Sequence, residues 1–593
     1  MGLTVGERLK KWIFQAVTGV LYMLFRLLSR QRHDGALKLS PIRNPLLKLS
    51  AVQLAEKIRK REVSSVEVVQ AFIDRIQEVN PLLNAMVNDR FSSALSEAAH
   101  VDQLIEEHTG GEEVLQEQLP LLGVPLSVKG SFFLQGMPCS VGMISRAGVI
   151  SSEDAPHVAL LKRAGAIPLG VTNTSELCMW METSNHLHGI TNNPYDIGRT
   201  SGGSSGGEGS IVSSGGSVIG IGSDIGGSIR MPCFFNGIFG HKPTPGIISN
   251  VGQHPAVSGL HDEFLSAGPL CRYAEDLLLM TRVMAGANAD KLSLSLEVDL
   301  KKLRFFTVVD DGGSPLTSPV DKQLMRAQRK VVRQLEEDLG VRVKDISFPQ
   351  LKYSYQIFDT FLALPDKDGK PPQSFVELMS DGGPGAWPLW ELIKWLFGKC
   401  DHTLPTIGNM PAKPNKCKKT PKTQSHVSSH SGPLAPPGLP MDTASAFWSW
   451  VHSESWSWAL LVSTCSATPS QFILQQKETL QREMDEVLGT DGVLLYPSHP
   501  LLAPRHHHPI FTPFNFSYTG IFNILGLPVS QCPLGLNEEG LPLGVQVVAG
   551  RLQDHLTLAM ARYLERAFGG WREPAAEAAG AHNLSQTQHH EKS

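Results

Sequence analysis

The residues with the clearest chemical potential lie in a glycine- and serine-rich stretch at 199 to 232, RTSGGSSGGEGSIVSSGGSVIGIGSDIGGSIRMP. Glycines permit positive φ and close approach of the backbone, and a serine hydroxyl becomes a nucleophile when a base lies beside it. A flexible Gly-Ser linker is the simple alternative. However, a strand-like run interrupts the stretch, and Asp224 to Arg230 end it with charged residues that a spacer does not need. A phosphate-binding loop is disfavoured, because no Gly-Lys-Ser/Thr follows the glycines.

Lys129 lies upstream of this stretch. It ends an apolar, β-rich run at 124 to 128. A lysine can accept a proton near neutral pH only if burial or neighbouring groups depress its pKa, and the end of an apolar strand offers such a setting. A lysine paired with a carboxylate at a strand end would be the simpler interpretation if the glycine motifs were absent.

Together these motifs resemble the amidase signature family. The resemblance is carried by Gly202-Gly203-Ser204-Ser205-Gly206-Gly207, by Asp224-Ile225-Gly226-Gly227-Ser228-Ile229-Arg230, and by Val124-Pro125-Leu126-Ser127-Val128-Lys129-Gly130. Lys129 precedes Ser204 by 75 residues and Ser204 precedes Ser228 by 24, which is similar to the family's mammalian fatty-acid amide hydrolases. The resemblance covers about residues 45 to 571, apart from a segment at 401 to 470.

The resemblance implies a serine hydrolase that cleaves fatty-acid amides, such as long-chain primary amides and N-acylethanolamines, through an acyl-enzyme. It implies a catalytic triad in which Ser228 attacks and a neutral Lys129 moves the proton through Ser204. It further implies an oxyanion hole made by backbone N–H groups, namely those of Ile225, Gly226, Gly227 and Ser228. Three more residues, Ser205, Asp224 and Arg230, are expected to brace these loops. No cofactor and no metal is expected.

Other reactive residue types give weaker functional signals. His506, His507 and His508 could suggest a metal site, but adjacent side chains in a loop seldom converge on one ion. His499 resembles a catalytic base, yet the family's triad uses no histidine. The eight cysteines show neither Cys-x-x-Cys pairs nor regular spacing, so they predict neither a zinc site nor a disulfide framework.

The elements that must position the motifs read as an α/β domain over residues 45 to 573. Helical periodicity covers 51 to 63, 65 to 79 and 157 to 163, with Ser50 and Ser64 as expected helix caps. Strand-like runs occur at 124 to 128, 166 to 171, 217 to 221 and 492 to 496, and a helix is expected at 472 to 488. This alternation predicts the amidase signature fold, a twisted mixed β-sheet covered by α-helices.

The first 35 residues are expected to be a membrane anchor. Residues 12 to 28 read WIFQAVTGVLYMLFRLL between basic flanks, and a helix of that length would span on the order of 25 Å, slightly less than the hydrocarbon core. A surface helix packed on the enzyme is the alternative. The expected location is therefore a membrane, with an endomembrane or a lipid-droplet surface both open.

Two further segments bear on the substrate side. Trp387 to Phe397 lies in a short amphipathic helix that is expected either to dip into a membrane interface or to belong to the core. Residues 401 to 470 are rich in Pro, Lys, Ser and Thr and read as a disordered insertion, and residues 574 to 593 read as a disordered tail.

Composition limits the partners. The chain has 593 residues, 19% of them charged, and a formal net charge of −4, which provides no basic field for nucleic acid. The expected partners are a lipid amide, a membrane and, as an open alternative, a second copy in a homodimer. Two rival functions remain: a glutaminyl-tRNA amidotransferase subunit, which would have no use for the anchor, and a non-enzymatic lipid-binding protein in which the insertion has broken the substrate channel.

Overall fold

The computed structural model describes residues 38–408, apart from 258, 367, 370, 371, 374, 382–387 and 397, together with residues 471–574. These residues belong to two units: a larger one formed by the chain up to 372 and from 469 onward, and a smaller one from 373 to 468. The expected anchor at 1 to 35, residues 409 to 470 of the expected insertion, and nearly all of the expected tail lie outside the described residues.

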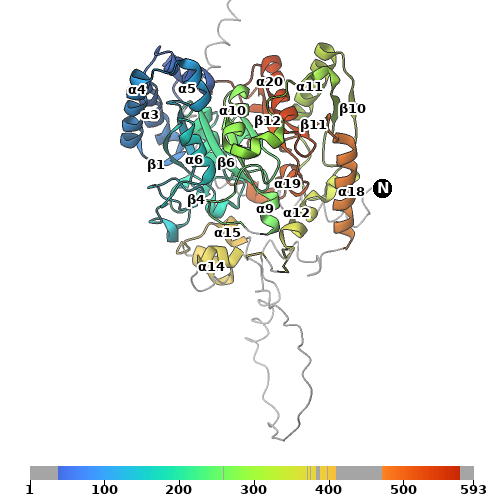
Figure 1. Ribbon diagram of the computed structural model, residues 1–593. Coiled ribbons are helices and arrows are strands. Elements are labelled where there is room, and N and C mark those ends of the chain that lie inside the picture. Colours follow the sequence, from blue (N-terminus) through green and yellow to red (C-terminus); the bar gives the residue numbers. More distant parts are fainter. Residues whose placement is uncertain are drawn as a thin grey trace, which may run out of the picture. The chain divides into compact units, whose positions relative to one another are not determined.

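The larger unit is organised around an 11-stranded mixed sheet in the described residues, in the order β1-β3-β2-β6-β8-β7-β12-β13-β11-β9-β10 (Figure 1). Its strands are β1 Met86–Asp89, β2 Pro125–Lys129, β3 Ile167–Thr172, β6 Ile219–Asp224, β7 Phe239–Lys242, β8 Ser266–Cys271, β9 Arg304–Thr307, β10 Val343–Asp345, β11 Gly492–Tyr496, β12 Val529–Leu536 and β13 Pro542–Ala549. Strands β3, β2 and β6 run parallel, whereas β8 and β7 continue the sheet antiparallel. A separate short hairpin pairs β4 Ser184–Asn185 with β5 Gly189–Ile190.

Helices cover both faces of this sheet. They are α2 Ala51–Arg59, α3 Ser65–Leu83, α4 Phe91–Glu107, α5 Glu112–Gln118, α6 Pro156–Arg163, α7 Gly206–Ser213, α8 Arg230–Phe235, α9 Leu260–Phe264, α10 Ala274–Ala285, α11 Lys322–Leu339, α12 Ser354–Leu362, α18 Gln471–Leu488, α19 Ser517–Ile524 and α20 Asp554–Phe568. Successive residues of a strand point to opposite faces. In β7, a Cβ at Gly240 would meet Cys233 of α8, whereas His241 bonds Asp554 of α20. Helices α8 and α20 therefore lie on opposite sides of the sheet.

Local sequence explains these elements well. Ser50 accepts from the Gln53 N–H in a capping box at the start of α2, and Ser64 accepts from the Glu67 N–H at the start of α3. Both predicted caps are confirmed. The predicted strands and helices are present with boundaries shifted by a few residues, and β11 matches its prediction residue for residue.

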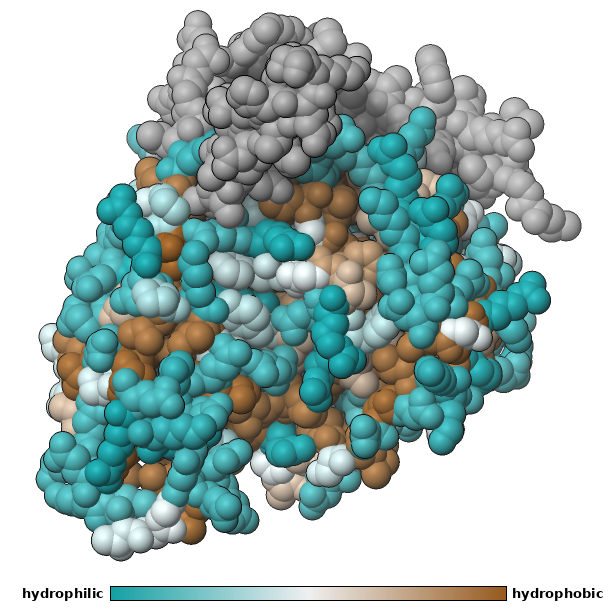
Figure 2. All heavy atoms as spheres, turned by 90° about the horizontal axis from the view of Figure 1, so that it is seen from above, coloured by the Kyte–Doolittle hydropathy of each residue, from teal (hydrophilic) through white to brown (hydrophobic). Residues whose placement is uncertain are grey.

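Two contiguous clusters of apolar side chains form the core of the larger unit, one around β2, β3 and β6 and the other around β11, α18 and α19. The core begins slightly before the predicted boundary at residue 45, because Leu39 and Ile42 are buried in it. On the face shown in Figure 2, hydrophilic side chains predominate, and the apolar ones lie in separate areas among them, as on most protein surfaces.

In the smaller unit, the described residues form α13 Phe375–Ser380, α14 Pro388–Leu396 and α15 Leu404–Gly408. Helix α14 confirms the helix predicted there. Helix α15 lies inside the range predicted to be a disordered insertion, so at least the first residues of that range are structured. Among all the described residues, no helix combines the length and the apolar character needed to cross a membrane.

Candidate active site

The three residues of the predicted triad lie where strands of the sheet end and helices begin. Lys129 is the last residue of β2, Ser204 lies just before α7, and Ser228 lies in the turn between β6 and α8. Strands β2 and β6 are parallel neighbours, so their carboxyl ends meet at one edge of the sheet. The carboxyl edge of parallel strands is a common place for a ligand site in α/β proteins.

The contact between the lysine and the first serine is direct. Lys129 Nζ lies 2.7 Å from Ser204 Oγ and 2.9 Å from Ser223 Oγ. The exposed fraction rises from 0% at Lys129 through 1% at Ser204 to 8% at Ser228. The lysine is therefore at the closed end of the site and Ser228 at the open end, an order that suits proton transfer from an attacking serine inward to a base.

The surroundings of Lys129 favour its neutral form. Burial lowers the pKa of Lys129 below the ordinary value, because a charged ammonium loses its hydration in the interior. Cys178, Asp224 and Glu208 act in the opposite direction and raise that pKa. The net downward shift is what a lysine needs to serve as a general base near neutral pH.

A buried carboxyl group, Glu208 on α7, accompanies the lysine. Ser127 Oγ donates to its Oε2 at 2.6 Å, and Thr172 Oγ1 donates to its Oε1 at 2.7 Å. Burial raises the pKa of Glu208 to about 7, although these hydroxyls and the charge of Lys129 act against that rise. Burial thus shifts the pKa of Lys129 downward and the pKa of Glu208 upward, and both shifts favour the uncharged forms of the pair.

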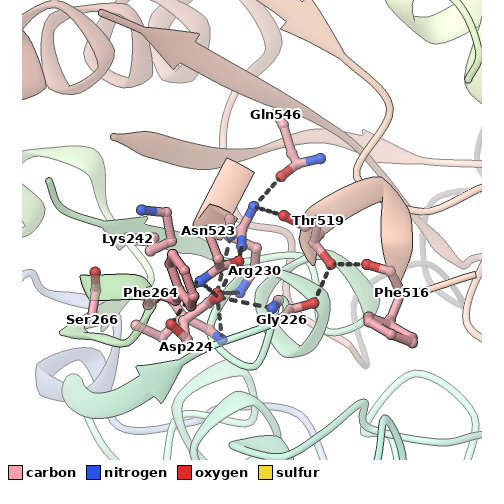
Figure 3. A network of polar contacts seen from close by, with 12 residues as sticks. Asp224, Gly226, Arg230, Lys242, Phe264, Ser266, Phe516, Thr519, Asn523 and Gln546 are labelled. Carbon is pink, nitrogen blue, oxygen red and sulfur yellow. Dashed lines mark hydrogen bonds and ion pairs between the residues drawn. The ribbon is translucent and has the colours of Figure 1, made fainter. Parts of the chain in front are cut away.

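The turn that carries Ser228 is held by a buried ion pair, shown in Figure 3. Arg230 and Asp224 are both fully buried and joined by two bonds, Nε to Oδ2 at 3.0 Å and Nη2 to Oδ1 at 2.8 Å. The remaining guanidinium donors reach Thr519 O, Gln546 Oε1 and Asn523 Oδ1 at 2.6 to 2.9 Å. All five N–H groups of the guanidinium thus have acceptors. Burial opposes ionisation of Asp224, but Arg230, Lys242 and Asn523 together outweigh it and hold the pKa of that carboxyl below its usual value.

The four backbone N–H groups predicted to form the oxyanion hole differ in their hydrogen bonds. The Gly227 N–H donates to Asp224 Oδ1 at 2.8 Å, so this N–H group already has an acceptor within the turn. Among the described residues, no acceptor is bonded to the N–H groups of Ile225, Gly226 or Ser228. These three N–H groups are the ones left to stabilise an oxyanion.

Two of the three residues predicted to brace the loops do so through their side chains, and the third does so through its backbone. Asp224 and Arg230 brace the turn through the ion pair. Ser205 contributes through its backbone N–H, which donates to Ser228 O at 3.3 Å, whereas its buried hydroxyl has no hydrogen-bond partner among the described residues. The residue next to Ser204 is thereby tied to the residue that carries the candidate nucleophile.

Sequence reasoning missed several residues around Lys129. Ser223 bonds its amine, and Thr174 donates to Ser204 O at 2.9 Å while lying 3.3 Å from Cys178 Sγ. Ser223 could have been found, because it precedes Asp224 at the end of the strand beside β2. Thr174 and Cys178 lie outside every motif, and only the tertiary fold brings them here.

His499 and His506 form their hydrogen bonds with residues outside the predicted triad. His499 contacts Phe235 edge-on and bonds Leu501 O, and burial lowers its pKa to about 4. His506 bonds Glu182 Oε1 at 2.9 Å and Ile197 O at 3.0 Å. In the described part of the chain, no three His, Cys, Asp or Glu side chains are grouped so that they could hold a metal ion.

Fold and geometry together describe an α/β protein in which a buried lysine amine contacts a serine hydroxyl beside a glycine-rich turn. The chain matches the family described as Amidase over residues 67–368 and 452–558, which is more than half of its length, and it therefore belongs to that family. The resemblance expected from the motifs is confirmed.

Known proteins resemble the chain along most of its length. Fatty-acid amide hydrolase 2-B of Danio rerio is 64% identical over 97% of this chain and 99% of its own length. Fatty-acid amide hydrolase 2 of Homo sapiens is 48% identical over 90% of this chain and 91% of its own. Among solved structures, a fatty acid amide hydrolase superposes with a TM-score of 0.63 at 24% identity, covering 90% of this chain and 87% of that one. The structural likeness supports the fold.

Proposed function

We propose that the chain is a serine hydrolase that cleaves fatty-acid amides to a free fatty acid and an amine or ammonia. The observation that carries the proposal is the buried Lys129 amine, 2.7 Å from Ser204 Oγ, next to the turn that presents Ser228. The substrate class is supported by two relatives that are 48% and 64% identical and carry the name fatty-acid amide hydrolase.

Attack begins at Ser228. Its Oγ forms a bond to the amide carbonyl carbon while its proton passes to Ser204 Oγ, which gives its own proton to the neutral Lys129. The carbonyl oxygen becomes an oxyanion that accepts hydrogen bonds from the N–H groups of Ile225, Gly226 and Ser228. Fixed dipoles in a buried site stabilise such a charge without having to reorganise.

Collapse of the intermediate requires the proton to return. An amine departs well only when protonated, so Lys129 gives the proton back through Ser204 to the leaving nitrogen as the C–N bond breaks. An ester of the acyl chain on Ser228 remains. A water molecule then attacks this ester, the same relay takes and returns its proton, and the fatty acid and free Ser228 are released.

The proposal extends to a membrane, where a lipid amide would be encountered. Two features support it: the apolar run at 12 to 28, and the pattern of exposure on α14. In that helix Trp390 is 53% and Trp395 36% exposed, whereas Glu391 is only 5% exposed, pairs with Lys394 at 2.7 Å and accepts from Cys400 Sγ. A helix that exposes its indoles and buries its acid suits an interface better than contact with water. We place the chain on a membrane by a single N-terminal anchor.

The proposed reaction is tested on the purified full chain with a fluorophosphonate reporter and with a long-chain primary amide whose fatty acid product is measured. Both signals should disappear in Ser228→Ala. Ser213→Ala is a matched control that should keep both, because its buried hydroxyl has no hydrogen-bond partner among the described residues. Activity above about a hundredth of wild type in Ser228→Ala would contradict the assignment of the nucleophile. Hydrolysis of free glutamine without any lipid amide hydrolysis would favour the amidotransferase alternative.

A further inference from the structure

The peptide between Gly226 and Gly227 lies at the centre of the oxyanion turn and is held at both ends. Its N–H donates to Asp224 Oδ1 at 2.8 Å, and its carbonyl oxygen accepts from Thr519 Oγ1 at 2.6 Å (Figure 3). Thr519 lies on α19, 293 residues further along the chain. One end of this peptide is therefore fixed by the signature motif itself, and the other end by a hydroxyl from a distant helix.

The Thr519 hydroxyl has one proton and two carbonyls within reach. It lies 2.6 Å from Gly226 O and 2.7 Å from Phe516 O. Phe516 O already accepts from the backbone N–H groups of Thr519 and Gly520, both at 2.9 Å. No other donor bonds Gly226 O among the described residues. Because a buried carbonyl without a donor is costly, the proton belongs on Gly226 O.

This bond matters because the peptide has glycine on both sides. Glycine lacks the Cβ that limits rotation of the neighbouring peptide planes, and Gly227 has a φ of 119°, a region that side chains rarely allow. Rotation of this plane would turn the Gly226 carbonyl away from Thr519 and the Gly227 N–H away from Asp224. The turn that presents the N–H groups of Gly226 and Ser228 would then lose two of its fixed points.

We propose that Thr519 is a positioning residue that locks the Gly226–Gly227 peptide and so keeps the oxyanion hole formed. This inference rests on the proposed hydrolase function. Thr519 acts through the Gly226 carbonyl, and its hydroxyl is the part that matters. Its methyl group is not needed for this role.

The structure offers a clean way to remove the hydroxyl alone. Helix α19 is held beside the turn by other bonds: Asn523 Nδ2 donates to Asp224 O at 2.8 Å, and Arg230 Nη1 donates to Thr519 O at 2.9 Å. Thr519→Val keeps the shape of the side chain and leaves these bonds in place. Thr519→Ser keeps the hydroxyl and loses only the methyl group. Thr281→Val is the matched control, since Thr281 is fully buried and its hydroxyl has no partner among the described residues.

The experiment measures kcat and KM for a long-chain primary amide, together with inhibition by a long-chain aldehyde that forms a tetrahedral adduct with the serine. Loss of one direct oxyanion donor lowers kcat by about 10²- to 10³-fold, so loss of an indirect support should lower kcat by about 10- to 100-fold. In Thr519→Val we expect that loss with KM nearly unchanged, a parallel weakening of the aldehyde, and an unchanged pH profile. Thr519→Ser and Thr281→Val should stay within about threefold of wild type.

Thr519→Val with a kcat within threefold of wild type would overturn the proposal, and so would a Thr519→Ser variant as impaired as Thr519→Val. If Thr519→Val fails to fold, Thr519→Ala against Thr519→Ser makes the same comparison. If the wild type hydrolyses no lipid amide, the proposed substrate is wrong. The rate at which a fluorophosphonate labels Ser228 then tests Thr519 independently, because the phosphoryl oxygen occupies the same hole. A rate unchanged in Thr519→Val would overturn the inference.

Discussion

Replacing Asp224 by Asn should damage the protein far more than so small a change suggests. Both oxygens of the carboxylate face only donors. Oδ1 accepts from the Gly227 N–H, Arg230 Nη2 and Asn523 Nδ2, and Oδ2 accepts from the Ile229 N–H and from the backbone N–H and Nε of Arg230. An amide NH₂ in place of either oxygen would place its own hydrogens against the hydrogens of these donors. The guanidinium of Arg230 would also lose its counter-charge inside the protein.

The expected losses of stability and activity follow from this arrangement. Removing one partner of a buried ion pair costs about 3–5 kcal/mol, because the other charge stays buried without compensation. Natural domains are stable by only about 5–15 kcal/mol, so Asp224→Asn should fold but unfold at clearly lower denaturant. The turn loses its anchors at Gly227 and Ile229 at the same time. Amide hydrolysis should therefore fall by about two orders of magnitude or more, as for loss of an oxyanion donor.

Urea unfolding followed by tryptophan fluorescence measures the first effect, and fatty acid release from a primary amide measures the second. Asp299→Asn is the control, since Asp299 forms an exposed pair with Lys302 and should show no measurable change. The double variant Asp224→Asn with Arg230→Met removes both charges and should lose about 2–3 kcal/mol less than the sum of the single losses. Simple addition of the two losses, or an Asp224→Asn protein as stable and active as wild type, would refute the account of the ion pair.

Three further predictions concern other parts of the site and the membrane. Lys129→Ala should lower amide hydrolysis more than ester hydrolysis, since esters need less protonation of the leaving group, and wild-type activity should rise with pH as Lys129 loses its proton; equal losses for both substrates would argue against a role in proton return. Glu208→Gln should shift that rise to lower pH, because a negative Glu208, ionised above a pKa of about 7, raises the pKa of Lys129; a shift to higher pH in the measured pH–rate profile would contradict this sign. In protein lacking residues 1 to 32, replacing Trp390 and Trp395 by Ser should reduce co-sedimentation with lipid vesicles while circular dichroism stays unchanged; an unfolded variant would mean that the indoles stabilise the fold.

The sequence was sufficient for the parts of the site that lie within motifs. Lys129, Ser204 and Ser228 could be singled out because the motifs that contain them resemble the amidase signature. Thr519 and Asn523 could not be singled out, since nothing local distinguishes their segment from an ordinary helix. Their roles arise from contacts across almost 300 residues, which only tertiary packing creates. Periodicity likewise locates an element but does not show which backbone N–H groups are already bonded, as the Gly227 N–H is to Asp224.

Two features of the site can be tested separately: the surroundings of Lys129 and the support of the Gly226–Gly227 peptide. In the proposed mechanism, Glu208 acts on the proton relay through Lys129, whereas Thr519 acts on the oxyanion through the Gly226 carbonyl. The two side chains share no hydrogen-bond partner in the described chain. Thr519 is uncharged, so removing its hydroxyl should leave the pKa of Lys129 where it is. Combining Glu208→Gln with Thr519→Val should then multiply their separate effects on kcat, because independent sites add in free energy to within about 0.5 kcal/mol. The double variant should show the pH profile of Glu208→Gln and the reduced kcat of Thr519→Val. If the loss in the double variant departs from the product by more than about tenfold, the relay and the oxyanion turn form one coupled unit, and the assignment of separate roles to Glu208 and Thr519 fails.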